Sequence, residues 1–268
     1  MSQVESKAVN RDAVSYELIE TPSGNKIALL WMQNPPVNAL SKSVRVGLIE
    51  YLHAAIADES VEVIVISSKQ NLFSGGADIS EFSGGDLEPN LPAVLDVIEN
   101  SPKPVVAVLN GPAFGGGLEV ALSCHYRVTF ASNKVGLPEV NLGILPGAGG
   151  TQRLPRLAGV QQALDMIVSG RPVAAKKLPG VFDVVVDSPE TLLNSALAFC
   201  EEVIAGGSKV RKTCDLKIDV STAPKELFAQ YRKGLATKAR GFFAPERCIQ
   251  AVEASIALPF AQGLVREG

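Results

Sequence analysis

The chain has 268 residues, of which 46% are hydrophobic, and a formal net charge of −3 at neutral pH. This apolar content is enough to bury a sizeable core, so one large domain with a helical appendage is the favoured organisation and two small domains are the alternative. The small negative charge and a pI near 5.6 argue against a nucleic-acid partner, and no apolar run has the length of a membrane span.

Short apolar runs bounded by turn residues predict buried strands along the first half of the chain. The expected strands are 27–32, 61–67, 104–109 and 126–130. Ser41 opens an expected helix between the first two, because the apolar positions after it recur on one helical face. Shorter helices are expected at 92–100 and from the glycine triplet at 115–117 onward. This alternation predicts a mixed α/β fold.

The last third of the chain has a different, helical pattern. Helices are expected at 190–205, 224–239 and 245–258, the last two with pronounced apolar faces. We therefore divide the chain into a catalytic core over residues 1–200 and a helical region over residues 201–268. The apolar faces of that region must be buried, so it is expected to cover the active site or to mediate assembly.

Three glycine-rich turns carry the chemistry that the sequence suggests. The first spans 73–79, the second leads into Glu119, and the third surrounds Glu139 and continues to residue 150. A carboxylate that handles protons needs a second group to hold or return the proton, and backbone N–H groups at glycine and alanine turns can bind an oxyanion. The three turns together predict an acid/base pair beside an oxyanion hole.

Plainer interpretations stand beside this one. In the plainer interpretation Glu119 is an exposed helix residue, Glu139 is a loop residue without a catalytic role, and the glycine clusters are ordinary tight turns. The glycine runs lack the Gly-Lys-Ser/Thr of a phosphate loop, and Gln152 interrupts the dinucleotide-binding pattern. Asp78 is a candidate cap for a helix that begins near Ile79.

The histidines and cysteines offer little to a metal site or a Ser-His-Asp triad. His125, at the start of an expected strand, is interpreted as structural, and His53 is placed at the edge of the buried face of the first helix. The cysteines are scattered without a Cys-x-x-Cys pair, which favours reduced thiols in an intracellular protein. They are Cys124, Cys200, Cys214 and Cys248.

Taken in order, these motifs resemble the crotonase (enoyl-CoA hydratase/isomerase) superfamily. A closer resemblance is to the N-terminal hydratase/isomerase part of multifunctional fatty-acid β-oxidation enzymes, in which a 3-hydroxyacyl-CoA dehydrogenase follows. The resemblance implies a spiral of repeated ββα units with a C-terminal helical region. The stretches that carry it are 34–40, 73–82, 110–127, 135–157 and 244–248.

The resemblance also implies roles for individual residues. Glu119 and Glu139 would be the catalytic carboxylates, the N–H groups of Ala77 and Gly116 the oxyanion hole, and Gly147 a backbone contact to the attacking water. The implied substrate-binding residues are Asn38, Ala39, Leu40, Gly75, Asp78, Ile79, Ser80 and Leu142.

This sequence departs from the family pattern at two places. Many members have lysine where Ser80 stands, which puts one contact to the CoA phosphates in doubt. Pro179 is expected to shorten the helix before it.

The implied activity is hydration of trans-2-enoyl-CoA to 3-hydroxyacyl-CoA in fatty-acid β-oxidation, with Δ3-Δ2-enoyl-CoA isomerisation as a side activity. No cofactor or metal is expected, since CoA belongs to the substrate. Other CoA-thioester reactions are rivals within the fold, and a non-catalytic acyl-CoA-binding subunit that partners a 3-hydroxyacyl-CoA dehydrogenase is the alternative of another class.

The expected partners are the acyl-CoA thioester and either further copies of the chain or a downstream dehydrogenase domain, with no nucleic acid and no membrane. A monomer or small oligomer is expected, with the helical region folded over its own active site. The expected location is the cytoplasm, which the lack of a C-terminal Ser-Lys-Leu favours over the peroxisome.

Overall fold

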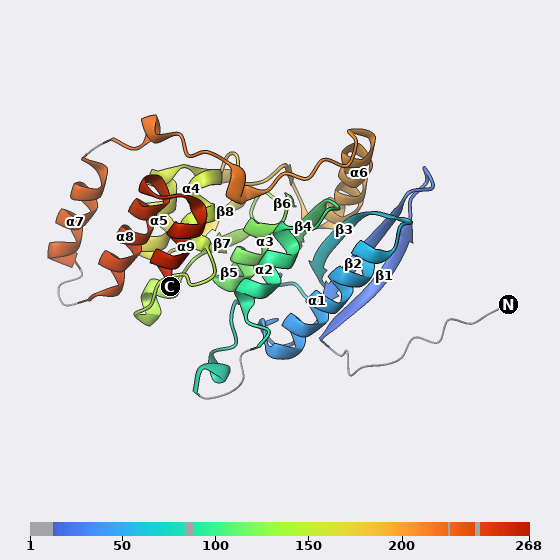
Figure 1. Cartoon of the computed structure of the whole chain (residues 1–268), viewed down its shortest axis with the longest axis horizontal. Coiled ribbons are helices and arrows are strands. Elements are labelled where there is room, and N and C mark those ends of the chain that lie inside the picture. The colour runs from blue at the N-terminus through green and yellow to red at the C-terminus, as the bar shows by residue number, and fades with distance from the viewer. Residues whose placement is uncertain (1–12, 84–87, 225, 239–241) are drawn as a thin grey trace.

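A mixed sheet and the helices on its two faces organise the molecule (Figure 1). The computed structural model describes residues 13–83, 88–224, 226–238 and 242–268. Its strands are β1 (Val14–Glu20), β2 (Lys26–Met32), β3 (Val61–Ser68), β4 (Val105–Leu109), β5 (Ala113–Phe114), β6 (Tyr126–Phe130), β7 (Lys134–Gly136), β8 (Val173–Ala174) and β9 (Val184–Val186). The four strands expected from the sequence correspond to β2, β3, β4 and β6.

In the described residues, the main sheet has the order β1-β2-β3-β4-β6-β9. β1 pairs with β2 antiparallel, and the remaining neighbours are parallel. Parallel strands that are buried on both faces are expected to be continuous apolar runs. β2 is an example, because its successive residues alternate between two hydrophobic cores. One core contains Ile27 and Leu29, and the other contains Ala28 and Leu30. A smaller sheet joins β5, β7 and β8.

The helices include the expected ones and others that the sequence did not reveal. They are α1 (Lys42–Ala57), α2 (Leu91–Glu99), α3 (Gly116–Ser123), α4 (Gly150–Ala158), α5 (Val160–Ser169), α6 (Leu192–Ala205), α7 (Leu227–Lys238), α8 (Ala244–Ala257) and α9 (Phe260–Glu267). The 3-10 turns are η1 (Ile79–Ser83), η2 (Glu139–Leu142), η3 (Ala175–Lys177), η4 (Pro189–Thr191), η5 (Thr213–Asp215) and η6 (Val220–Thr222). Neither α4 nor α5 was predicted, nor was α9.

Several local predictions are confirmed. Ser41 is the N-cap residue of α1, and Asp78 accepts hydrogen bonds from the amide and hydroxyl of Ser80 at the start of η1. The helix before Pro179 is reduced to the single turn η3. His125 is buried, and its Nδ1 accepts a hydrogen bond from the Val105 amide at 2.9 Å, as a structural histidine does. His53, in contrast, is exposed on α1.

The predicted division of the chain at residue 200 needs correction, because it cuts through α6. This helix packs on one face of the main sheet, where Leu192, Ala196 and Cys200 join the core that contains β2 and β4. A helical region that excludes α6 begins after Ala205. Residues 1–12 and 84–87 of the predicted core and residues 225 and 239–241 of the helical region lie outside the described residues.

The C-terminal helices lie at the end of the molecule opposite β1 (Figure 1). α8 contacts α4, α5, α7 and η2, and α9 contacts α4 and α8. Their apolar faces are buried within the chain: Cys248, Ile249 and Val252 of α8 are fully covered. These helices therefore support the elements that carry the glycine-rich third turn.

Candidate active site

The three glycine-rich turns meet around one cavity of about 340 Å³. The segment after β3 forms one wall, the start of α3 forms the floor, and η2 with the loop that follows it closes the other side. A volume of this size lies in the range of small-molecule sites. Among the described residues, none after residue 200 lines this cavity.

Two backbone amides face the cavity close to each other. Gly116 is the first residue of α3, and an ideal Cβ built on it would lie 3.6 Å from the Ala77 nitrogen. Gly76, with a φ of +103°, turns the chain so that Ala77 can approach, and the Gly76 carbonyl accepts a hydrogen bond from the Leu40 amide at 2.8 Å. Within the described part of the chain, neither the Ala77 nor the Gly116 amide is seen to donate a hydrogen bond. Two neighbouring amides of this kind at a cavity are what an oxyanion hole requires.

Glu119 lies in the first turn of α3 and is 2% exposed. Its Oε1 accepts hydrogen bonds from the amides of Ala148 at 2.9 Å and Gly150 at 2.8 Å. Burial raises the pKa of this carboxyl, and the two amides oppose that rise. Because one oxygen is fixed by two donors, the orientation of the carboxyl is fixed as well.

Glu139, the first residue of η2, has a different environment. Its Oε2 is buried and has no hydrogen-bond partner among the described residues. Burial, followed by the charge of Glu119, raises the pKa of Glu139 to about 8. At neutral pH this carboxyl therefore holds a proton for most of the time, and its neutral form is a hydrogen-bond donor and a proton source.

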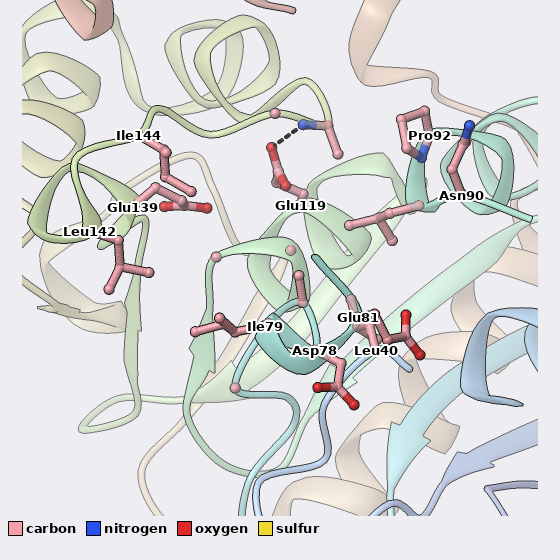
Figure 2. A pocket seen from close by; sticks show the side chains of 18 of the residues that line it. Leu40, Asp78, Ile79, Glu81, Asn90, Pro92, Glu119, Glu139, Leu142 and Ile144 are labelled. Atoms are coloured by element: carbon pink, nitrogen blue, oxygen red, sulfur yellow. Dashed lines mark hydrogen bonds between the residues drawn. The ribbon is translucent and has the colours of Figure 1, made fainter. Parts of the chain in front are cut away.

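Figure 2 shows Glu119 and Glu139 on opposite sides of the cavity, with Ile144 and Leu142 beside Glu139. Ile79 and Leu142 are large apolar residues that are more than half exposed, at 61% and 62%. Such apolar side chains at the cavity suit a ligand with an apolar part, since binding would remove them from water.

Of the residues proposed from the sequence, ten line this cavity. They are Leu40, Gly75, Ala77, Asp78, Ile79, Gly116, Glu119, Glu139, Leu142 and Gly147. An ideal Cβ built on Gly147 meets no atom within 4 Å, so this position faces open space.

The structure places the other three proposed residues outside the lining. Asn38 is buried, and its amide nitrogen donates to the Phe73 carbonyl at 2.6 Å and the Ser68 hydroxyl at 3.1 Å. The Ala39 carbonyl accepts from Asn34, and the Ser80 hydroxyl donates to Asp78. The polar atoms of the Asn38 side chain hold together the turn that precedes Ala77, and a substrate contact at Asn38 stays a prediction.

Three charged residues of the site region, Arg45, Glu81 and Glu267, were not predicted from the sequence. Arg45 of α1 is buried at the cavity, where it pairs with Glu81 at 2.8 Å and donates to the carbonyls of Leu40 and Pro89, both at 2.6 Å. The position of this arginine between Val44 and Val46 was the only sequence signal for it.

Glu267 of α9 is 5% exposed and lies next to the loop that holds Glu119. Burial, followed by the charge of Glu119, raises the pKa of Glu267 to about 7. Nothing in the sequence marks this glutamate, which is separated from its partners by more than a hundred residues.

The sequence of residues 23–242 matches a family model for enoyl-CoA hydratase/isomerase. The chain belongs to the enoyl-CoA hydratase/isomerase family. It is 42% identical over 255 residues to a peroxisomal bifunctional enzyme of Danio rerio and 41% identical over 246 residues to that of Homo sapiens. The matches cover 94% and 91% of this chain but 34% of each relative, so the chain spans about a third of the length of these relatives. A probable enoyl-CoA hydratase of Bacillus subtilis is 44% identical over 158 residues, which cover 56% of this chain and 61% of the relative.

Solved structures confirm the fold class. An enoyl-CoA hydratase of Bacillus anthracis matches with a TM-score of 0.65 and 26% identity, covering 95% of this chain and 88% of that one. An enoyl-CoA hydratase subunit of Geobacillus kaustophilus gives a TM-score of 0.64 at 28% identity, covering 96% and 88%. The predicted crotonase-like fold and the resemblance to multifunctional β-oxidation enzymes are both confirmed.

Every helix in the described part of the chain is too short or too polar to traverse a lipid bilayer. Among the same residues, no cluster of three or more His, Cys, Asp or Glu is arranged to hold a metal ion.

Proposed function

We propose that this chain is an enoyl-CoA hydratase, which adds water across the trans-2 double bond of an enoyl-CoA to give a 3-hydroxyacyl-CoA in fatty-acid β-oxidation. The observation that carries the proposal is the pairing of a buried carboxyl, Glu119, with a half-buried one, Glu139, at a cavity that also presents the Ala77 and Gly116 amides. Family membership supports it, because hydration and isomerisation of enoyl-CoA give the family its name.

The two amides would bind the thioester carbonyl oxygen, where negative charge gathers as the double bond is attacked. Glu119 would take a proton from a water molecule while the water oxygen bonds to Cβ. Glu139, which enters the reaction protonated, would give its proton to Cα. The net change is the addition of one water, and the cycle closes when the proton on Glu119 returns to Glu139.

These steps balance in protons and electrons with groups of the chain alone. We therefore propose that the reaction uses no metal or redox cofactor. The same pair would also support a shift of a proton between C2 and C4, and we propose Δ3-Δ2-enoyl-CoA isomerisation as a side activity on this ground. Isomerisation needs one carboxyl, whereas hydration uses both, so hydration ranks first.

We further propose that the product passes to a 3-hydroxyacyl-CoA dehydrogenase, as a downstream domain or a separate partner, because the new hydroxyl at C3 is the group that such an enzyme oxidises. The proposed compartment is the cytoplasm. Co-purification of dehydrogenase activity with the chain, and its distribution in fractionated cells, would test these two points.

The decisive experiment follows the ultraviolet absorbance of the conjugated enoyl thioester during incubation with the purified chain. Wild type should consume enoyl-CoA, and Glu119→Gln and Glu139→Gln should each lower kcat by about 10²–10⁴-fold, the contribution of a positioned acid or base. Glu190→Gln is the matched control, since Glu190 is an exposed carboxylate outside the cavity. A wild-type chain that binds enoyl-CoA without consuming it would instead support the non-catalytic acyl-CoA-binding function.

A further inference from the structure

The loop that holds Glu119 lies between two carboxylates. Four successive backbone amides, of residues 148–151, donate alternately to Glu119 and to Glu267. The donors are, in chain order, Ala148 (to Oε1 of Glu119, 2.9 Å), Gly149 (to Oε1 of Glu267, 2.6 Å), Gly150 (to Oε1 of Glu119, 2.8 Å) and Thr151 (to Oε2 of Glu267, 3.0 Å). The Thr151 hydroxyl also donates to Oε2 of Glu267.

The peptide unit between Ala148 and Gly149 is held at both ends. Its carbonyl accepts a hydrogen bond from Nη1 of Arg153 at 2.9 Å, and its N–H donates to Glu267. Arg153 is itself fixed by a buried ion pair with Glu99 at 2.7 Å. Gly149 has a φ of +95°, and a Cβ there would lie 2.1 Å from Nη1 of Arg153, so only glycine permits this arrangement.

Close packing of α9 on α4 brings Glu267 to this loop. An ideal Cβ on Gly263 would lie 2.1 Å from Oε1 of Gln152, which shows that the two helices approach without space for a side chain. The guanidinium groups of Arg153 and Arg156 each lie 5.0 Å from the centre of the Phe260 ring. The carboxylate oxygens of Glu267 are therefore held in place by α9, which is fixed on α4 through the Gly263 and Phe260 contacts as well.

We propose that Glu267 is a positioning residue for Glu119: it fixes the alternating amides of the 148–151 loop so that Ala148 and Gly150 both point at Oε1 of Glu119. The kinetic test of this proposal rests on the proposed function, whereas its test by hydrogen exchange does not. Without Glu267, the amides of Gly149 and Thr151 lose their acceptors, and a loop that turns to satisfy them moves the two donors of Glu119 as well.

The kinetic test uses Glu267→Gln, which keeps the shape of the side chain but directs an amide N–H₂ at a backbone donor. We expect kcat to fall by about 10–100-fold, the range typical of groups that orient an active residue. KM should change by less than about threefold, because Glu267 does not line the cavity. Arg266→Gln, on the same turn of α9 and exposed, is the matched control and should behave as wild type.

Coupling distinguishes positioning from a merely structural role. In a Glu119→Gln background, Glu267→Gln should lower the residual rate by less than about twofold, since the residue it positions is already gone. Independent, multiplying losses, or an unchanged kcat in the single variant, would overturn the proposal. All rates are measured well below the unfolding temperature of each variant, and Glu267→Asp, which keeps the charge, replaces the Gln variant if the latter does not fold.

Hydrogen exchange gives a readout that needs no activity. The Ala148 and Gly150 amides should exchange at least about tenfold faster in Glu267→Gln than in Arg266→Gln, as expected for donors whose acceptor geometry is disturbed. If the wild-type chain does not hydrate enoyl-CoA, the proposed function is wrong, but the exchange rates of the Ala148 and Gly150 amides still test the positioning role of Glu267. Unchanged exchange rates at both amides would refute that role.

Discussion

At the scale of single residues, two glutamates twenty positions apart have different surroundings. Glu119 accepts two backbone hydrogen bonds, which favour its charged form, whereas Oε2 of Glu139 is buried without a partner among the described residues. The charge of Glu119 raises the pKa of Glu139 further, and the two amides that donate to Glu119 favour a shared proton on Glu139. This division agrees with Glu119 as base and Glu139 as acid.

The first prediction concerns pH. Because the pKa of Glu139 is raised to about 8, its protonated form predominates below that pH and is lost above it. If Glu139 is the acid, kcat/KM should fall as pH rises through about 8, approaching a tenfold loss for each further pH unit, because kcat/KM reports the pKa of the free enzyme. A profile of kcat/KM against pH measures this. A rate that stays level to pH 10 would show that Glu139 does not act as the acid.

The second prediction concerns the pair. Since both carboxyls act on one water, the loss of kcat in Glu119→Gln/Glu139→Gln should be far smaller than the product of the two single losses. Turnover of each single variant and of the double variant, measured with the same enoyl-CoA, provides the comparison. Fully multiplicative losses would mean that the two groups serve separate steps.

The third prediction concerns the Ala77 and Gly116 amides. A CoA thioether that lacks the carbonyl cannot accept their hydrogen bonds, so it should bind more weakly than the matching saturated thioester, by about 1–3 kcal/mol if the two donors are left without an acceptor. Isothermal titration calorimetry gives both dissociation constants. Equal affinities would argue against an oxyanion hole at this place.

At the scale of elements, the buried Glu99–Arg153 ion pair joins the end of α2 to α4, and Glu99 also accepts a hydrogen bond from the Cys214 amide of η5 at 2.9 Å. Arg153 in turn holds the Ala148 carbonyl. One charged pair therefore ties together three elements that are distant in the sequence and supports the loop behind Glu119.

The fourth prediction compares this pair with an exposed one. Glu99→Gln leaves the Arg153 guanidinium buried without its counter-charge, and we expect a loss of about 3–5 kcal/mol in the free energy of unfolding. Glu253→Gln breaks the exposed pair with Arg232 on α7 and should cost less than about 1 kcal/mol. Urea unfolding of both variants measures the difference; similar values would mean that the buried pair has no special structural role.

At the scale of the whole molecule, the C-terminal helices are built into the body of the chain. α8 contributes Cys248, Ile249 and Val252 to the main core, and α9 delivers Glu267 to the α4 loop. Burial of these faces within one chain removes the need for another subunit to cover them, which supports the prediction of a monomer or small oligomer. The prediction that these helices cover the active site remains to be tested, because the described residues that line the cavity come from other elements.

The fifth prediction concerns this arrangement. Static light scattering at several concentrations should show a monomer or a weak small oligomer. Truncation after residue 222 should lower both solubility and acyl-CoA binding, since it uncovers core residues and removes α8, which packs against η2 at the cavity wall. A hexamer that persists below micromolar concentration would contradict the assembly prediction. A soluble and fully active truncated chain would contradict the role given to the helices.

The fold was predictable where a local pattern was strong. Both faces of the parallel sheet are buried, so its strands β2, β3, β4 and β6 are apolar runs. A run of this kind can be recognised from the sequence alone. α4 was not visible, because it begins at Gly150 and contains Pro155, two residues that usually mark turns. The two-residue strands β5 and β8 are too short to have a periodicity of their own.

The sequence by itself determined which groups are candidates for the chemistry: two carboxylates framed by glycines, and amides free of obstructing side chains. Only the tertiary structure showed how the two carboxyls differ, because burial and amide donors come from segments that meet after folding. It also revealed Glu267, whose partners lie 116 and 118 positions away. A hydrogen bond depends on distance in space, and no spacing along the chain records a contact between segments that meet only after folding.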